Sequence, residues 1–175
     1  LTTERAAHTL RVASMATENC RRCNIPEKKA VTAAALHDAA KYVKLSDKML
    51  KGFVPPKDVP ESVMHQYTGA YLAEHEFGVT DEDILNAIRY HTSGRAGMSE
   101  LEKLICFSDM LEEGRDYDGV ERLRRLFYKD IDECAEQSLE EELEHLEKSG
   151  KKVYPLTRQA YEYFHELNAN KTLKN

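Results

Sequence analysis

The chain has 175 residues, of which 41% are hydrophobic and 32% are charged, enough for one globular domain and incompatible with wholesale disorder. The formal net charge of −6 at pH 7 disfavours duplex nucleic acid as the main partner, because proteins that bind it are usually basic. The sequence has no run of about 20 apolar residues, so we expect no membrane span.

Helical periodicity dominates the sequence, and strand signals are nearly missing. Pro26 is placed to open the second helix, Asp81 to cap the fourth, and Ser99 to cap the fifth with Glu102 at capping-box spacing. Residues 52–60 hold three prolines and are predicted to form a loop. The sequence predicts an all-α single domain over residues 1–169 and a polar tail over 170–175. The predicted helices are 3–22, 27–42, 61–77, 81–91, 99–112, 120–148 and 157–168.

Acidic and imidazole side chains stand among apolar neighbours in several of these helices. His37 and Asp38 follow the small apolar run 33–36, and Asp109 lies within 99–112. A carboxylate inside a helix beside a packed face is costly unless it is paired or bound to a metal. His8 adds an imidazole from the first helix. Each of these residues alone is adequately explained as a surface or core residue, but the set predicts a site between helices for Fe, Mn, Co or Zn rather than Ca.

Three cationic side chains accompany these candidate ligands. Arg5 lies three residues before His8, and Lys41 lies four residues after His37, on the same face of the predicted helix. Arg115 follows the Asp109 helix. Together they would suit a polyanion such as a phosphate chain, although Lys41 considered alone is better explained as a solvated lysine on a helix surface.

The four cysteines, Cys20, Cys23, Cys106 and Cys134, are too few for a disulfide framework in a chain of this length. Cys20 and Cys23 have CxxC spacing, but neither a second pair nor a βαβ context accompanies them. We therefore expect structural thiols in a reduced, cytoplasmic protein. Because the chain starts at Leu1 with a helical pattern already under way, we also expect a missing upstream segment.

The order of the candidate ligands resembles the HD superfamily of metal-dependent phosphohydrolases. Several strings are similar to the branch of bacterial symmetrical bis(5'-nucleosyl)-tetraphosphatases and cover most of residues 5–120. Ser93, Ser108 and Glu113 depart from the residues usual in that branch, and the C-terminal third matches more weakly. The strings are RAAHTLRV (5–12), HDAAK (37–41), HQYTGA (65–70), IRYHTSG (88–94), EKLICFSD (102–109) and EGRDYDGV (113–120).

The resemblance implies an all-α HD-type helical bundle that holds a transition metal, first of all iron, with Co, Mn, Ni or Zn as alternatives. It implies hydrolysis of diadenosine tetraphosphate to two ADP. In other HD branches, histidines at places comparable to His65 and His91 bind a second metal, so the number of ions stays open. The implied metal ligands are His8, His37, Asp38 and Asp109, and the implied nucleotide or phosphate contacts are Arg5, Lys41, His65, His91, Thr92 and Arg115.

The predicted mechanism is attack of metal-activated water on a central phosphorus. Asp38 or Asp109 would orient the water, Lys41 would offset charge on the phosphate chain together with the two arginines, and His65 or His91 would supply a proton to the leaving group.

Two alternatives stay open: another HD-type nucleotide phosphohydrolase, including one for a guanosine alarmone, and a non-catalytic metal- and nucleotide-binding domain. A homodimer is a further possibility, because Phe53 and Val54 place apolar side chains in the proline-rich loop, where they would serve either a dimer contact or a lid over a pocket.

Overall fold

The computed structural model describes residues 2–173, and within that range every regular element is a helix. The predicted all-α fold is confirmed. None of the helices in the described part of the chain combines the length and apolar character needed to cross a bilayer. The helices are α1 (Thr3–Cys20), α2 (Glu27–Leu36), α3 (Glu61–His75), α4 (Glu82–Arg89), α5 (Glu100–Leu111), α6 (Val120–Lys129), α7 (Ile131–Lys148) and α8 (Pro155–Thr172).

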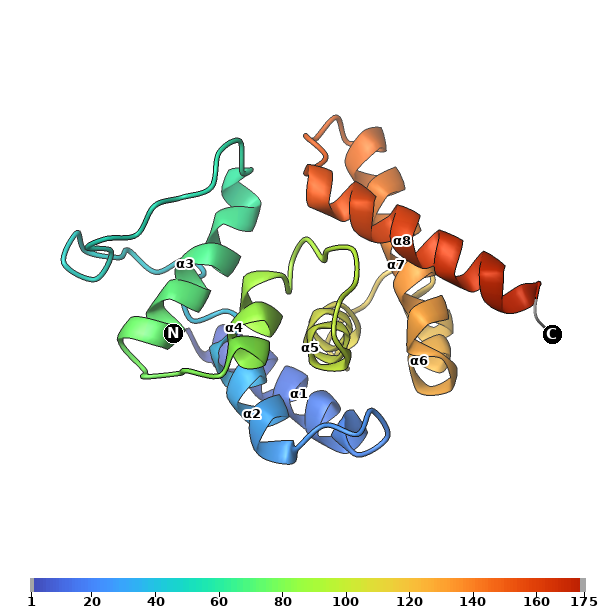
Figure 1. The fold of residues 1–175 in the computed structure, drawn as a ribbon, viewed down its shortest axis with the longest axis horizontal. Helices are drawn as coiled ribbons and strands as arrows, with labels where there is room; N and C mark the ends of the chain where they lie inside the picture. The colour runs from blue at the N-terminus through green and yellow to red at the C-terminus, as the bar shows by residue number, and fades with distance from the viewer. Residues whose placement is uncertain (1, 174–175) are drawn as a thin grey trace.

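Helix α5 forms the centre of the fold. It packs against α1, α2, α4, α6 and α7, while α3 packs on α4 and α8 on α7 (Figure 1). Ten of its twelve residues are buried, so this helix is enclosed on nearly every side. An acidic residue on α5 therefore lies inside the molecule and needs partners from other helices.

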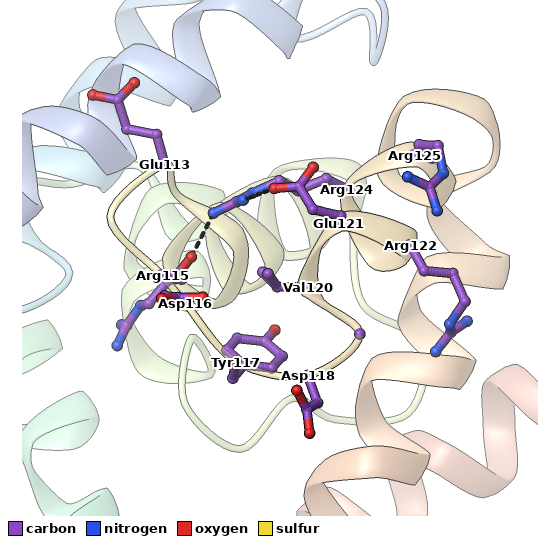
Figure 2. A pocket seen from close by; sticks show the side chains of 11 residues that line it. Glu113, Arg115, Asp116, Tyr117, Asp118, Val120, Glu121, Arg122, Arg124 and Arg125 are labelled. Atoms are coloured by element: carbon purple, nitrogen blue, oxygen red, sulfur yellow. Dashed lines mark hydrogen bonds and ion pairs between the residues drawn. The ribbon is translucent and has the colours of Figure 1, made fainter.

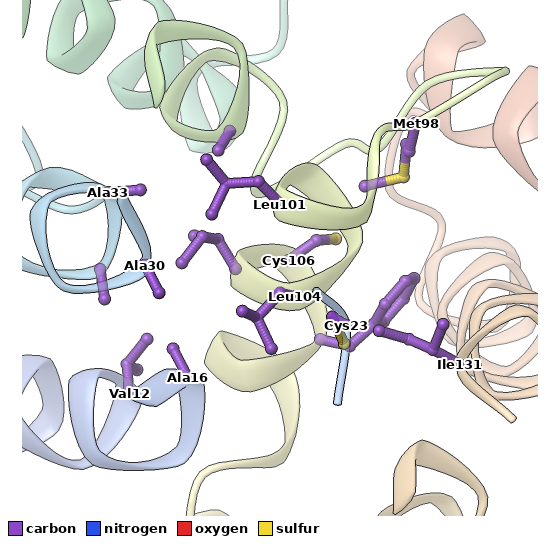
Figure 3. Packing of buried hydrophobic residues seen from close by; sticks show 14 of the residues in the cluster. Val12, Ala16, Cys23, Ala30, Ala33, Met98, Leu101, Leu104, Cys106 and Ile131 are labelled. Carbon is purple, nitrogen blue, oxygen red and sulfur yellow. The ribbon is translucent and has the colours of Figure 1, made fainter. Parts of the chain in front are cut away.

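Small side chains let α1 and α2 approach α5 closely. Ala16 of α1 and Ala30 and Ala33 of α2 face Leu101 and Leu104 of α5 (Figure 3). All five are at most 1% exposed. Burying each leucine fully contributes about 1.5–3 kcal/mol to stability. This packing fixes α1 and α2 relative to α5, and these three helices carry the predicted metal ligands.

Two of the predicted helix caps are confirmed. The side chain of Asp81 accepts hydrogen bonds from the N–H groups of Asp83 and Ile84 at the start of α4. Ser99 Oγ accepts a hydrogen bond from the N–H of Glu102, 3.2 Å away, at the start of α5. The Glu102 carboxylate instead accepts two hydrogen bonds from Arg95, so only half of a capping box forms.

The second helix is shorter than predicted, because α2 ends at Leu36 and not near Tyr42. The N–H of Ala39 bonds to the carbonyl of Leu36 and that of Lys41 to the carbonyl of Asp38, both at 3.0 Å. These three-residue spacings describe tight turns rather than an α-helix, and Tyr42 has a positive φ of 57°. Asp38 and Lys41 therefore lie in turns, and the predicted shared helix face of His37 and Lys41 is wrong.

The predicted helix 120–148 is also wrong, because Asp130 divides it into α6 and α7. Asp130 has an extended backbone, with φ −149° and ψ 108°. Its side chain accepts hydrogen bonds from the N–H groups of Asp132 and Glu133 and so caps α7. At the other end, α8 continues to Thr172 and includes the first residues of the expected polar tail. Residues 174–175 of that tail lie outside the described part of the chain.

Candidate metal centre

Three helices bring the four predicted ligands into one buried cluster. His8 comes from α1, His37 and Asp38 from the segment directly after α2, and Asp109 from α5. His8 Nε2 lies 3.0 Å from Asp109 Oδ1 and 3.6 Å from Asp38 Oδ2. His37 Nε2 lies 3.5 Å from Asp38 Oδ2 and 4.0 Å from Asp109 Oδ1. Two imidazole nitrogens and two carboxylate oxygens thus converge on one point.

A second group of donors shares Asp38 with the first. Asp38 Oδ1 lies 3.4 Å from His65 Nε2 and 3.4 Å from His91 Nε2. The two imidazole nitrogens lie 3.1 Å from each other. His8, His37 and Asp109 form one group that could hold a cation, and Asp38, His65 and His91 form another. The two oxygens of Asp38 therefore face different groups.

The hydrogen bonds of the imidazole rings leave lone pairs directed into the cluster. His37 Nδ1 donates to the carbonyl of Ala34 at 2.6 Å, and His91 Nδ1 donates to the carbonyl of Ile88 at 2.8 Å. In a neutral ring, Nε2 then carries a lone pair. Among the described residues, the buried side-chain atoms without a hydrogen-bond partner include Nε2 of His8, Nε2 of His37 and both oxygens of Asp38, of which Oδ2 is ion-paired with Arg5. Lone pairs so close together need a cation, and this donor set fits a transition metal.

Burial and neighbouring charges set the protonation states of the cluster. Burial lowers the pKa of His37 to about 3. Burial and the neighbouring His91 lower the pKa of His65 to about 3. For Asp109, burial alone would raise the pKa, but the contact with His8, the neighbouring rings of His37 and His91 and the Arg115 guanidinium hold it well below its usual value. Neutral imidazoles and ionised carboxylates are the forms that bind metals.

The three predicted cations lie beside the two carboxylates. Arg5 forms an ion pair with Asp38 Oδ2, and Lys41 Nζ lies 3.6 Å from Asp38 Oδ1. Arg115 Nη2 donates to Asp109 Oδ1 at 2.7 Å. The side chains of Arg5, Lys41 and Arg115 are 21%, 20% and 37% exposed, whereas that of Asp38 is 2% exposed. The cations therefore lie on the solvent side of the cluster, where an anionic ligand would approach.

Thr92 completes the set of predicted residues. Its Oγ1 lies 3.0 Å from His65 Nε2 and 3.1 Å from His91 Nε2. The structure therefore brings every candidate residue of the sequence analysis into one connected cluster.

Three residues of this region were not predicted from the sequence as part of the site: Glu112, Arg11 and Gln66. Glu112 contacts His8 and Arg11, and Gln66 bonds to the backbone of Thr92. Burial alone would raise the pKa of Glu112, but hydrogen bonds from Arg11, the Gly114 N–H and His8 lower it to about 2. Helical spacing places the first two beside predicted ligands, because Arg11 lies three residues after His8 and Glu112 three residues after Asp109, but it does not show which partners they contact.

A surface hollow of about 630 Å³ lies beside the cluster, along residues 113–125 (Figure 2). Arg124 crosses it and donates to Glu121 and to the carbonyl of Arg115. Among the candidate site residues, Arg115 belongs to this lining. The hollow is open, and its acidic and basic side chains lie next to one another. In the histidine cluster, by contrast, lone pairs of nitrogen and oxygen converge without hydrogen-bond partners. We therefore assign the candidate active site to the cluster and not to the hollow.

Comparison with known proteins agrees with this geometry. The HD domain family model matches residues 5–114. The symmetrical bis(5'-nucleosyl)-tetraphosphatase of Bacillus subtilis (strain 168) is 38% identical, and the alignment covers 93% of this chain and 90% of the relative. The protein of the same name from Halalkalibacterium halodurans is 33% identical, with coverages of 92% and 89%.

A solved structure agrees as well. The Clostridium acetobutylicum protein described as a "predicted HD superfamily hydrolase involved in NAD metabolism" superposes with a TM-score of 0.84 and 29% identity. The match covers 95% of this chain and 91% of that one. The family model, the curated relatives and the fold give one answer: the chain belongs to the HD-domain family and is a relative of its symmetrical bis(5'-nucleosyl)-tetraphosphatases.

Proposed function

We propose that this protein hydrolyses dinucleoside tetraphosphates symmetrically and releases two ADP from diadenosine tetraphosphate. The names of relatives at 33–38% identity, aligned over about nine tenths of both chains, support the substrate. The observation that carries the chemistry is the buried cluster in which one oxygen of Asp38 faces His8 and His37 and the other faces His65 and His91. Hydrolysis of a phosphoanhydride needs charge compensation and an oriented water, and this cluster offers ligands and cations for both.

The first metal position would be held by His8, His37, Asp38 and Asp109. Among the metals that suit such ligands, iron is our first candidate, and Co, Mn, Ni and Zn are the alternatives. A bound transition metal supplies a Lewis acid and lowers the pKa of a coordinated water. The carboxylate oxygens of Asp38 and Asp109 would accept hydrogen bonds from the attacking water and orient it.

His65 and His91 are better suited to hold a second cation than to donate a proton. Because His91 Nδ1 donates to Ile88, its Nε2 is a lone-pair donor directed at Asp38 and His65. Thr92 can donate its hydroxyl hydrogen to only one of these nitrogens at a time. A cation held by Asp38, His65 and His91 would satisfy all of these atoms.

The phosphate chain would approach from the side of Arg5, Lys41 and Arg115. These cations compensate the charge that develops on the leaving diphosphate. Arg5 and Arg115 also pair with the ligand carboxylates, so they are held in place before a substrate arrives. A homodimer and a cytoplasmic location stay predictions.

The decisive experiment is product analysis with diadenosine tetraphosphate in ¹⁸O-labelled water. With Fe²⁺ or Co²⁺ present, we expect cleavage at the central phosphoanhydride to yield two ADP molecules per substrate. One of the two ADP molecules should carry one ¹⁸O atom from the water. Asp109→Ala should abolish turnover, and Asp118→Ala, which changes an exposed aspartate, should not.

Other outcomes identify the alternatives. ATP plus AMP as products would contradict symmetrical cleavage. Faster hydrolysis of a mononucleotide or a guanosine alarmone would favour another phosphohydrolase. Binding of ADP without hydrolysis under any of the five metals would favour a non-catalytic domain.

A further inference from the structure

A buried carboxylate lies at the other ring nitrogen of His8. His8 Nε2 faces Asp109 Oδ1, and His8 Nδ1 lies 3.2 Å from Glu112 Oε1. The side chain of Glu112 is 2% exposed. Asp109 and Glu112 are one helical turn apart, so α5 supplies a partner to each nitrogen of the same imidazole.

Glu112 is held from several directions and is no ligand of the cluster itself. Its Oε2 accepts hydrogen bonds from Arg11 Nε and from the N–H of Gly114, the latter at 2.6 Å. Its Oε1 accepts from His8 and, at 3.3 Å, from Arg11 Nη2. Both oxygens are therefore engaged by groups outside the metal positions, and the two-pronged contact with Arg11 fixes the plane of the carboxylate.

Gly114 provides the space that Arg11 needs. A Cβ atom at Gly114 would lie 2.6 Å from both Nε and Nη2 of Arg11, closer than such atoms approach in proteins. Any larger residue would push the guanidinium away from Glu112. The contact of Arg11 with Glu112 thus depends on a glycine in the following loop, which is an observation independent of the His8 distance.

We propose that Glu112, fixed by Arg11 and Gly114, is the positioning residue that makes His8 a metal ligand. This inference rests on the proposed function only in so far as the cluster binds a cation. An ionised carboxylate has no hydrogen to donate, so His8 must carry its hydrogen on Nδ1. When the ring is neutral, its lone pair then lies on Nε2, directed at Asp38 and Asp109, where a bound cation would replace the hydrogen that Asp109 otherwise accepts from Nε2. Carboxylates behind ligand histidines act in this way in metal sites generally.

The test compares Glu112→Gln with Glu113→Gln, the same change at the adjacent, exposed glutamate. Titration with Co²⁺ alone measures cation affinity. We expect Glu112→Gln to weaken it by about 10–100-fold and Glu113→Gln to leave it unchanged. Long-range ¹H–¹⁵N spectra of the metal-free protein report the tautomer directly. His8 should be protonated on Nδ1 in the parent, and Glu112→Gln should populate the Nε2-protonated form.

Gly114→Ala is the second variant and keeps Glu112 itself. It should displace Arg11 and change Co²⁺ affinity and the His8 tautomer in the same direction as Glu112→Gln, by a smaller factor. Parent-like affinity and parent-like His8 signals in a folded Glu112→Gln protein would overturn the proposal. Should that variant not fold, the same parent-like result in Gly114→Ala would overturn it. Neither the Co²⁺ titration nor the spectra use a nucleotide. Both therefore test this inference even if the proposed substrate is not hydrolysed.

Discussion

The side-chain carbonyl of Gln66 accepts a hydrogen bond from the backbone N–H of Thr92, 3.2 Å away. The same oxygen accepts the N–H of Ser93 at 3.1 Å, and Gln66 Nε2 donates to Ser93 Oγ at 3.0 Å. Gln66 is fully buried next to His65 on α3. One side chain therefore ties α3 to the segment after α4 and holds His65 and Thr92 in register.

Replacement of Gln66 by Ala should destabilise the fold. The N–H of Ser93 is buried and would lose its partner, and each buried polar group left without a partner costs about 1–3 kcal/mol. Urea unfolding measures the change. Gln159→Ala, at an exposed site on α8, is the matched control and should stay within about 0.5 kcal/mol of the parent. Equal stabilities of the two variants would contradict this role of Gln66.

Asp38 faces both groups of donors, so its substitution should affect both. We expect Asp38→Asn to lower the metal content of dialysed protein at both positions and to reduce hydrolysis by more than about 100-fold, beyond the usual effect of an outer residue. His65→Asn should deplete the second position and spare the first. Metal analysis and kinetics of the two variants distinguish these effects. Full metal content in Asp38→Asn would show that Asp38 is not shared.

Cation binding should stabilise the folded protein. A ligand that binds only the folded state at 100 times its dissociation constant adds about 2.7 kcal/mol to the free energy of unfolding. Thermal unfolding with increasing Co²⁺ measures this gain, and a chelator should reverse it. His37→Asn should show a much smaller response, whereas His145→Asn on α7, outside the cluster, should respond like the parent. A parent-like response in His37→Asn would exclude the cluster as the binding place.

Stability should fall in acid because of the ion pairs of Asp132. Burial alone would raise its pKa, but hydrogen bonds from Lys103 and Lys171 lower it below the usual value. The unfolded pKa is about 3.9, so these bonds stabilise the fold above that pH. Their contribution is lost as the pH falls through the lower folded-state pKa.

The substitution Asp132→Asn tests the contribution of these ion pairs to the stability of the fold. At neutral pH it should cost about 1–3 kcal/mol, because charge-assisted bonds to a buried lysine are lost. The difference from the parent should shrink below about pH 4. Glu140→Gln, on an exposed site of the same helix, is the control. A constant difference at all pH values would contradict the assignment.

The sequence was sufficient for the helical class because apolar spacing dominates most elements, and α1 and α3 end only two residues before their predicted ends. It was insufficient at Asp130, where neither Gly nor Pro marks the break. There the side chain of Asp130 caps α7, so the helix ends and a new one begins although the apolar spacing continues. The spacing of Asp130 and Glu133 is typical of an N-cap and was available as a signal.

For the site, the candidate residues came from their types and from a family resemblance, and the structure brings them together. The conformation of Asp38 could not be predicted, because turns replace the helix after Leu36 and rotate it between two sets of histidines. Glu112 was missed for a different reason. Its importance arises from contacts with His8, more than 100 positions away in sequence, and helical spacing alone does not show which face meets which partner.

The central position of α5 links the interior of the protein to its chemistry. Leu104 (Figure 3) and Phe107 fill the core from the helix that presents Asp109 and, at its C-cap, Glu112. Replacing one of these core side chains by a smaller one would let α5 shift or rotate. Displacements of the metal ligands by less than an ångström are enough to impair a metal enzyme. Substitutions far from any nucleotide would then slow turnover while the protein still melts cooperatively, a phenotype easily mistaken for long-range regulation.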